Sequence, residues 1–372
     1  MTSKERLLIA INREKPDRLP VTIHQWQPYH LATYMGGMSD IEAFRATGMD
    51  MAIQYLDPVG MFCTSSTEDI RRWSTSTWRQ SIEVIDPNPE NFIVKHCITT
   101  PEGILTFQTG ANSKTTWLTE HMVKRDEDIE LIKKFMPVPT LNVSETVEYY
   151  DRIGDEGILR GYVYGDQAGA WQHAACLVDP QELIVATFEK PDWVHELLGI
   201  LMEKKLQFIE GMRGAKFDLV ETGGGSGSST LISPEIHAEF CTPYDRKMHD
   251  ALHALGFKTT YHTCGGTKGI EELIVANGTD VSETMAPVSI GGNQQPWEYK
   301  DKIAGRIALI GGVDQFGVLT SGDVALIRST VHELFEKVGS DGGYICAASD
   351  HFFDAPKENL VMFAQAAKEC VY

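Results

Sequence analysis

The sequence has no apolar run close to the roughly 18 residues that a membrane-spanning helix requires. Its N-terminal segment also lacks the uninterrupted apolar stretch of a signal peptide, because charges interrupt the helical pattern from Lys4 to Arg13. Basic residues are scarce, 33 against 52 acidic ones, which gives a net charge of −19. A field of this sign repels nucleic acid and anionic membranes. We therefore expect a cytoplasmic protein without nucleic-acid or membrane partners.

Cysteine is too sparse for a disulfide framework, since the seven cysteines are odd in number and dispersed over 372 residues. Any cysteine with a special role is then better explained as a metal ligand or a nucleophile. The chain also lacks an internal repeat, a low-complexity segment and a Pro/Ser-rich linker. These absences favour a single domain over residues 1–372.

Short apolar segments typical of buried strands alternate with helical patterns along the chain. Apolar residues recur with helical spacing over residues 191–212 and 234–255, and the second helix is predicted to begin at a Ser-Pro cap. Alternating strands and helices form a parallel sheet, and eight such units close into a (β/α)8 TIM barrel of the α/β class. The predicted strands are residues 19–24, 51–56, 158–164, 217–222, 257–263, 279–284, 306–311 and 343–347.

Residues from about 70 to 125 interrupt this alternation. Short strand-like stretches there are separated by the turn signals PNPEN and PEG. The pattern predicts an antiparallel β excursion in the N-terminal third, inserted into the barrel and not a separate domain.

Barrel enzymes carry their active sites at the carboxyl ends of the strands, and the strongest signal there is His262-x-Cys264. Residues i and i+2 of a strand point to the same side, and imidazole and thiolate are both zinc ligands. Cys346 occupies an equivalent strand end and is the predicted third ligand. Glu221 is the first choice for an oxygen ligand and Glu283 the alternative, although an HxC pair also arises by chance. Catalytic roles are predicted for Glu221, His262 and Cys264.

The other strand ends supply a predicted substrate pocket. Aromatic side chains near the first strand could hold a substrate, but core packing explains them equally well. The predicted pocket residues are His24, Trp26, Tyr29, Asp166 and Gln167. The glycine-rich stretch 223–227 could form an anion cradle at a helix start, but it matches no phosphate-binding motif, and an ordinary βα loop is the preferred interpretation.

Several stretches of the sequence resemble uroporphyrinogen decarboxylase-like proteins. They are the opening MTSKERLLIAINREKPDRLPV, residues 231–266 (LISPEIHAEFCTPYDRKMHDALHALGFKTTYHTCGG), residues 309–323 (LIGGVDQFGVLTSGD) and residues 342–360 (GGYICAASDHFFDAPKENL). The resemblance extends over nearly the whole chain and implies a (β/α)8 barrel, in agreement with the strand pattern.

The resemblance implies one of two chemistries. Decarboxylases of this superfamily carry an arginine-rich segment after the first strand and need no metal, whereas residues 24–37 here contain no arginine. The corrinoid-dependent methyltransferases bind zinc through an H-x-C motif and a distant C-terminal cysteine, which His262, Cys264 and Cys346 match. The resemblance therefore implies a zinc-dependent methyltransferase. It would move a methyl group between a small-molecule donor (aryl methyl ether, methylamine or methyl thioether) or a thiol acceptor and the cobalt of a corrinoid.

The chain has no corrinoid-binding D-x-H-x-x-G motif, so the corrinoid is expected on a separate partner protein. A homodimer is compatible with the sequence. Two alternatives stay open at this point: a metal-free decarboxylase of the same fold, and a non-enzymatic zinc-binding regulatory barrel.

Overall fold

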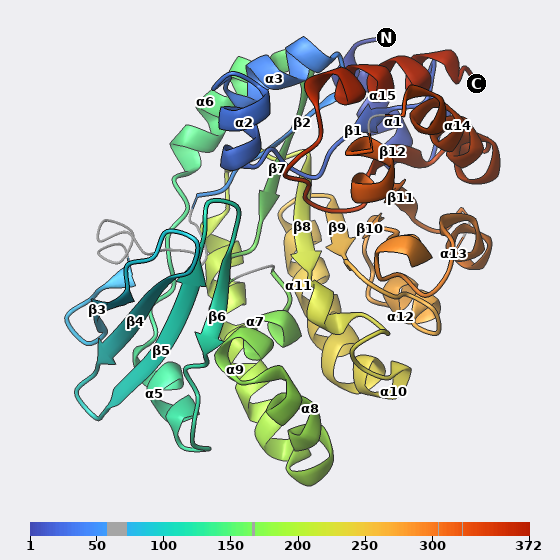
Figure 1. Ribbon diagram of the computed structural model, residues 1–372. Helices are drawn as coiled ribbons and strands as arrows, with labels where there is room; N and C mark the ends of the chain where they lie inside the picture. Colours follow the sequence, from blue (N-terminus) through green and yellow to red (C-terminus); the bar gives the residue numbers. More distant parts are fainter. Residues whose placement is uncertain (58–72, 166–167, 304, 322) are drawn as a thin grey trace.

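The computed structural model describes residues 1–57, 73–165, 168–303, 305–321 and 323–372. Its centre is an eight-stranded parallel sheet with the order β1-β12-β11-β10-β9-β8-β7-β2 (Figure 1). Every strand overlaps one of the predicted strands, which confirms the TIM-barrel prediction. The strands are β1 (Val21–Thr22), β2 (Met51–Gln54), β7 (Gly157–Tyr162), β8 (Leu219–Gly223), β9 (Thr259–His262), β10 (Val281–Thr284), β11 (Ala308–Val313) and β12 (Tyr344–Ala348).

The two edge strands, β1 and β2, are joined through Asp50. The Asp50 backbone nitrogen donates to the Val21 carbonyl at 2.7 Å, and its carboxylate accepts from the Val21 backbone nitrogen at 3.0 Å. Arg6 and Arg18 hold the same carboxylate at 2.7 and 2.9 Å. The barrel is thereby nearly closed.

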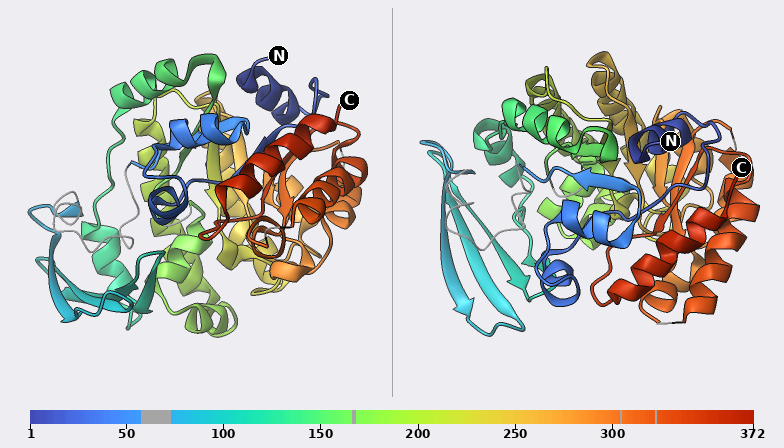
Figure 2. Two further views of the ribbon diagram at one scale, coloured as in Figure 1. Left: turned by 45° about the horizontal axis from the view of Figure 1, so that its top comes forward. Right: turned by 90° about the horizontal axis from the view of Figure 1, so that it is seen from above.

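Helices surround the barrel, as Figure 2 shows. Helix α1 (Ser3–Ile11) lies against β7, β11 and β12 and closes the amino-terminal end. None of the described helices is both long and apolar enough to cross a membrane. The outer helices are α2 (Pro28–Tyr34), α3 (Asp40–Thr47), α5 (Asp128–Phe135), α6 (Val143–Ile153), α7 (Ala170–Leu177), α8 (Pro180–Glu189), α9 (Pro191–Gly211), α10 (Pro234–Ile236), α11 (Thr242–Ala254), α12 (Glu271–Ala276), α13 (Pro296–Ile303), α14 (Val324–Leu334) and α15 (Lys357–Glu369).

Both helices predicted from apolar spacing are present. Helix α9 matches residues 191–212, and α10 and α11 together cover residues 234–255, joined by a π-helical turn at His237–Cys241. Ser233 caps this composite helix as expected, because its hydroxyl accepts a hydrogen bond from the Ile236 backbone nitrogen.

Alternate residues of each barrel strand face the axis, which stacks the interior in layers. A lower apolar layer packs on α1 and contains Ile158, Leu219, Val281 and Ile345, one from each of four strands. Two residues further along three of these strands, the inward positions are polar: Arg160, Glu221 and Glu283. The barrel thus has an apolar base and a buried polar layer at the carboxyl ends of its strands.

A separate antiparallel sheet projects beside the barrel (Figure 2). It contains β3 (Arg79–Asp86), β4 (Phe92–Thr99), β5 (Ile104–Ala111) and β6 (Thr116–Glu120), so the predicted β excursion is confirmed. One face of this sheet carries the buried side chains of Ile98, Leu105 and Phe107. They belong to the same apolar cluster as the buried residues of the helices around the barrel, which we call the helical layer.

Asp245 of α11 is a buried acid whose side chain contacts Tyr261 of strand β9. Burial raises the pKa of the Asp245 carboxyl to about 7, although Tyr261 and Lys205 oppose the shift. The folded state therefore binds more protons than the unfolded state between about pH 4 and pH 7, and stability falls as the pH rises through this range.

We expect Asp245→Asn to flatten this pH dependence. The raised pKa of Asp245 corresponds to a loss of about 4 kcal/mol in the free energy of unfolding between about pH 4 and pH 7. Urea unfolding of wild type and variant between about pH 5 and pH 8 measures the slope. Asp250→Asn, at an exposed position of the same helix, is the matched control and should keep the wild-type slope. A wild-type slope in Asp245→Asn would contradict the assignment.

Candidate functional site

His262, the last residue of β9, lies at the centre of the polar layer and is completely buried. Its Nδ1 atom faces Glu283 Oε1 at 3.3 Å and Glu221 Oε1 at 3.7 Å. Its Nε2 atom is also buried and has no hydrogen-bond partner among the described residues. The two ring nitrogens thus have very different surroundings.

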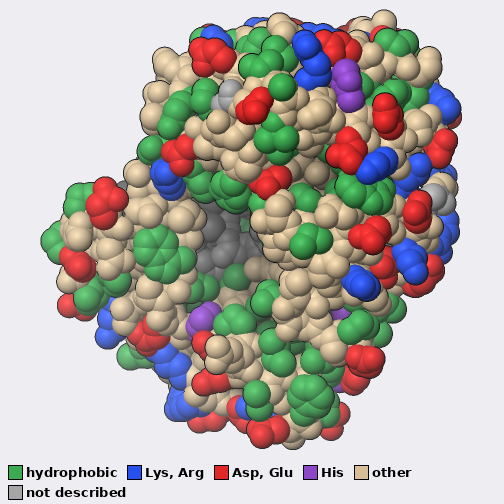
Figure 3. Space-filling model, turned by 45° about the vertical axis from the view of Figure 1, so that its right-hand side comes forward, with side chains coloured by type: hydrophobic (Ala, Val, Ile, Leu, Met, Phe, Trp, Pro, Cys, Tyr) green, Lys and Arg blue, Asp and Glu red, His purple; other side chains and the backbone are tan. Residues whose placement is uncertain are grey.

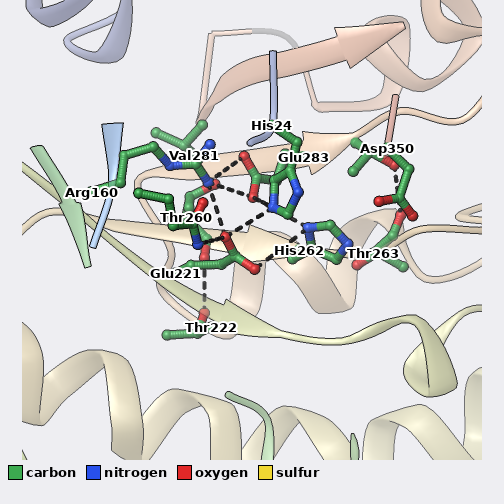
Figure 4. Close-up of polar contacts among 12 residues, drawn as sticks. His24, Arg160, Glu221, Thr222, Thr260, His262, Thr263, Val281, Glu283 and Asp350 are labelled. Atoms are coloured by element: carbon green, nitrogen blue, oxygen red, sulfur yellow. Dashed lines mark hydrogen bonds and ion pairs between the residues drawn. The ribbon is translucent and has the colours of Figure 1, made fainter. Parts of the chain in front are cut away.

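The guanidinium of Arg160 and the imidazole of His24 both point toward the two glutamates (Figure 4). Arg160 Nη2 donates to both oxygens of Glu283, at 2.7 and 2.9 Å, and to Glu221 Oε2 at 3.1 Å. Gln54 Nε2 donates to Glu221 Oε2 at 2.8 Å, and His24 Nε2 lies 3.1 Å from the same oxygen. Both carboxylates are therefore fixed in the barrel interior by cationic and polar neighbours.

These contacts decide the ionisation of the buried groups. Burial by itself would raise the pKa of Glu221, but the charge and hydrogen bond of His24 lower it well below its usual range. Burial would likewise raise the pKa of Glu283, and the Arg160 guanidinium lowers it instead. Burial would lower the pKa of His262, but Cys264 and the glutamates raise it well above its usual value. The charged and polar neighbours therefore offset the effect of burial on the pKa of all three groups.

A second group of ligand atoms lies on the other side of the His262 ring. Figure 4 shows Asp350 on the opposite side of the His262 ring from Glu221. The potential ligand atoms of His262, Cys264 and Asp350 lie within 4.8 Å of one another. His24, Asp350 and His351 form an overlapping group, in which His24 Nδ1 and His351 Nε2 are 3.0 Å apart. His262 therefore belongs both to a carboxylate group and to a thiol-containing group.

The glycine-rich residues 223–227 at the end of β8 pack closely against the His262–Cys264 segment because the glycines among them have no side chains. A β-carbon at Gly225 would lie 2.6 Å from Cys264 Sγ, and one at Gly223 would lie 2.5 Å from the His262 carbonyl oxygen. Gly223 also has a φ of +85°, a conformation that favours glycine. The loop serves to let β8 approach the His262–Cys264 segment.

A cavity of about 320 Å³ opens beside Cys264 and Asp350. Two of its polar atoms, Ser349 Oγ and Gln315 Oε1, are buried without a hydrogen-bond partner in the described part of the chain. None of the described residues that line it is a lysine or arginine; the remaining ones are Thr284, Ala286, Ile290, Phe316, His351 and Phe353. Figure 3 shows that the molecular surface is deeply hollowed between a projecting lobe and the body of the molecule.

Cys346 is a correction to the predicted ligand set. Its neighbours Ile345 and Ala347 face the barrel axis, so Cys346 points outward with Tyr344 into the helical layer. Burial there raises the pKa of its thiol to about 12. The structure does not bring Cys346 to His262 and Cys264, because it lies on the opposite face of its strand.

The predicted pocket residues have different positions. His24 belongs to the polar cluster, whereas Trp26 packs in the core against Phe44 and Phe352, with ring centroids 5.5 and 6.2 Å away. Tyr29 is half-buried near Lys114, whose Nζ lies 5.1 Å from the ring centroid. Asp166 and Gln167 lie outside the described residues.

Sequence reasoning missed Arg160, Asp350 and His351. Arg160 left a usable signal, because it is a lone charge within the apolar strand ILRGYVY, where a buried charge needs a partner. Asp350 and His351 lie two and three residues beyond the end of β12 and so satisfy the same strand-end rule that identified the other candidates.

Comparisons with known proteins agree with this architecture. A family model described as uroporphyrinogen decarboxylase (URO-D) matches residues 84–370. Among solved structures, a methyltransferase from Methanosarcina mazei superposes with a TM-score of 0.67 at 16% sequence identity, covering 99% of each chain. A likeness at this identity shows the shared fold. A search of curated proteins finds no match.

Proposed function

Because the chain belongs to the uroporphyrinogen decarboxylase (URO-D) family and combines histidine, cysteine and aspartate ligand atoms beside an open cavity, we propose that it is a zinc-dependent methyltransferase. In this proposal it exchanges a methyl group between a small molecule and a corrinoid carried by a separate protein. The observation that carries the proposal is the buried Nε2 atom of His262, which has no hydrogen-bond partner among the described residues, together with the group that His262 forms with Cys264 and Asp350.

The donor set suits zinc. A buried polar atom without a partner costs free energy, and a metal ligated by His262 Nε2 would remove that cost. Imidazole nitrogen, thiolate sulfur and carboxylate oxygen are the atoms that zinc accepts in proteins. We propose His262, Cys264 and Asp350 as the ligands, with the remaining position open to the cavity. When bound, zinc supplies a Lewis acid that activates a methyl donor or lowers the pKa of a thiol acceptor.

Glu221 and Glu283 fit an outer role better than direct ligation. Both face Nδ1 of His262, whereas Cys264 and Asp350 belong to the group on the other side of the ring. Histidine ligands commonly donate their second N–H to a carboxylate, which fixes the ring and its tautomer. We therefore propose that the glutamates orient His262, and that Asp350 takes the place expected for Cys346.

The cavity favours a small substrate without negative charge. Its volume of about 320 Å³ is at the lower end of small-molecule sites, and its described lining has no lysine or arginine. A porphyrinogen with many carboxylates would need such cations, so this lining disfavours the decarboxylase alternative. Ser349 Oγ and Gln315 Oε1 are placed to hydrogen-bond a polar group of the substrate. The corrinoid is too large for this cavity and would have to dock across the strand ends on its own protein.

Methyl transfer from candidate donors to cob(I)alamin, followed by absorbance, tests this function. The purified protein is expected to contain one zinc per chain and to form methylcobalamin with an aryl methyl ether, a methylamine or a methyl thioether. Removal of zinc by a chelator should abolish the reaction, and zinc addition should restore it. A protein without zinc would contradict the proposal, and so would full methyl transfer in the absence of any corrinoid.

A further inference from the structure

Arg160 connects the two strands that flank the His262 strand. It lies on β7 with 1% of its surface exposed, and its Nη2 atom contacts Glu221 on β8 and Glu283 on β10. Strand β9, which carries His262, lies between β8 and β10 in the sheet. Arg160 Nε and Nη1 have no hydrogen-bond partner in the described part of the chain. Among the described residues, the hydrogen bonds of this guanidinium thus all go to the two carboxylates beside His262.

We propose that Arg160 is a positioning residue for the zinc site, an inference that rests on the proposed function. Through its two bonds to Glu283, Arg160 fixes the carboxylate whose Oε1 lies 3.3 Å from His262 Nδ1. A proton held at Nδ1 by this contact leaves the lone pair of Nε2 available to a metal ion. Arg160 therefore acts on the zinc ligand through Glu283 without touching the metal.

The charges explain why a cation is required at this position. Glu221 and Glu283 are both buried, and both lie within 4 Å of His262 Nδ1. Two carboxylates so close together in a low-dielectric interior repel each other and lose hydration, which favours protonation or displacement of one of them. Arg160 offsets both effects with a permanent charge.

A double-mutant cycle on the full chain tests this role. Zinc affinity is measured by competition with a chromophoric chelator, and ligand geometry by the absorption spectrum of the Co²⁺-loaded protein. We expect Arg160→Met and Glu283→Gln each to weaken zinc binding by about 10- to 100-fold, the range for groups that orient a metal ligand. The double variant should bind zinc about as tightly as whichever single variant binds it less tightly. Both substitutions interrupt the same chain of contacts from Arg160 through Glu283 to His262, so their effects should not add. Both single variants should alter the Co²⁺ spectrum.

Arg6→Met is the matched control. Arg6 is also a buried arginine bound to two carboxylates, Asp17 and Asp50, but it belongs to helix α1 at the amino-terminal end of the barrel. Its loss should lower the melting temperature and leave zinc affinity unchanged. If Arg160→Met does not fold, Arg160→Lys decides the matter: weakened zinc binding at a wild-type melting temperature supports the proposal, and wild-type affinity overturns it.

Two further results would overturn the inference. One is wild-type zinc affinity in folded Arg160→Met, and the other is additive losses in the double variant, which would mean that Arg160 and Glu283 act independently. Failure of the wild-type protein to bind zinc would instead remove the proposed function itself, so the two failures are distinguishable.

Discussion

Replacing Cys264 with alanine is expected to abolish stoichiometric zinc binding and methyl transfer while the barrel remains folded. The thiolate is the softest donor near His262 Nε2, and its loss would leave only one nitrogen and one carboxylate ligand. The side chain lies beyond the end of β9 and outside both apolar clusters, so its removal should cost little stability. Metal analysis after dialysis, together with thermal unfolding, measures the two effects.

Cys346→Ala provides the matched control. Cys264 lies two residues beyond the end of β9, whereas Cys346 is the middle residue of β12 and is buried beside Tyr344. Its substitution should retain one zinc per chain and lower stability through the small cavity that it creates. The opposite pattern, with zinc lost in Cys346→Ala and kept in Cys264→Ala, would contradict the ligand set and restore the assignment made from the sequence.

A third outcome would point to the other side of the imidazole. If Cys264→Ala keeps zinc and Glu221→Gln loses it, the metal binds among His24, Glu221, His262 and Glu283, whose ligand atoms also lie within 4.8 Å of one another. We favour the Cys264 side because Arg160 already neutralises the two carboxylates, whereas Nε2 of His262 has no hydrogen-bond partner among the described residues.

The fold could be predicted from local sequence patterns because these patterns depend on which side chains are buried. The eight strands were recognisable as short apolar runs, and all eight lie in the parallel sheet. The insertion was recognisable because turn signals replaced helical spacing, and β3–β6 form an antiparallel sheet there. In each case the hydrophobic effect acts on neighbouring residues, so the sequence pattern carries the information.

The site was predicted only where strand spacing determined it. The pair His262-x-Cys264 obeys the two-residue repeat of a strand, and Glu221 and Glu283 end neighbouring strands. The same repeat excludes Cys346, since a shift of one residue moves a side chain to the other face. Distinguishing the faces of β12 required the position of Ile345 in the barrel interior, which no local pattern of the short run GYICA determines. The contacts of Asp350 depend on an irregular segment after the strand, where periodicity gives no guide.

Substitution of Asp350 is therefore the clearest test between the zinc ligands predicted from the sequence and those proposed from the structure. Asp350→Ala removes the only carboxylate in the group with His262 and Cys264, and zinc affinity is expected to fall at least 100-fold. Methyl transfer should fall with it, because the same carboxylate borders the cavity. Chelator competition and the cob(I)alamin assay measure the two losses.

Asp354→Asn controls for the loss of a nearby negative charge. Asp354 lies four positions further along the chain, is 43% exposed at the side chain and pairs with Lys114 at 2.7 Å. Its substitution should leave zinc affinity and methyl transfer close to wild type. If Asp350→Ala binds zinc as tightly as wild type and Glu221→Gln does not, the oxygen ligand is Glu221, as the strand-end pattern alone predicts. If Asp350 is a zinc ligand, Asp350→Asn should retain more zinc than Asp350→Ala. An amide oxygen is a weaker ligand than a carboxylate, but it can still occupy the coordination position.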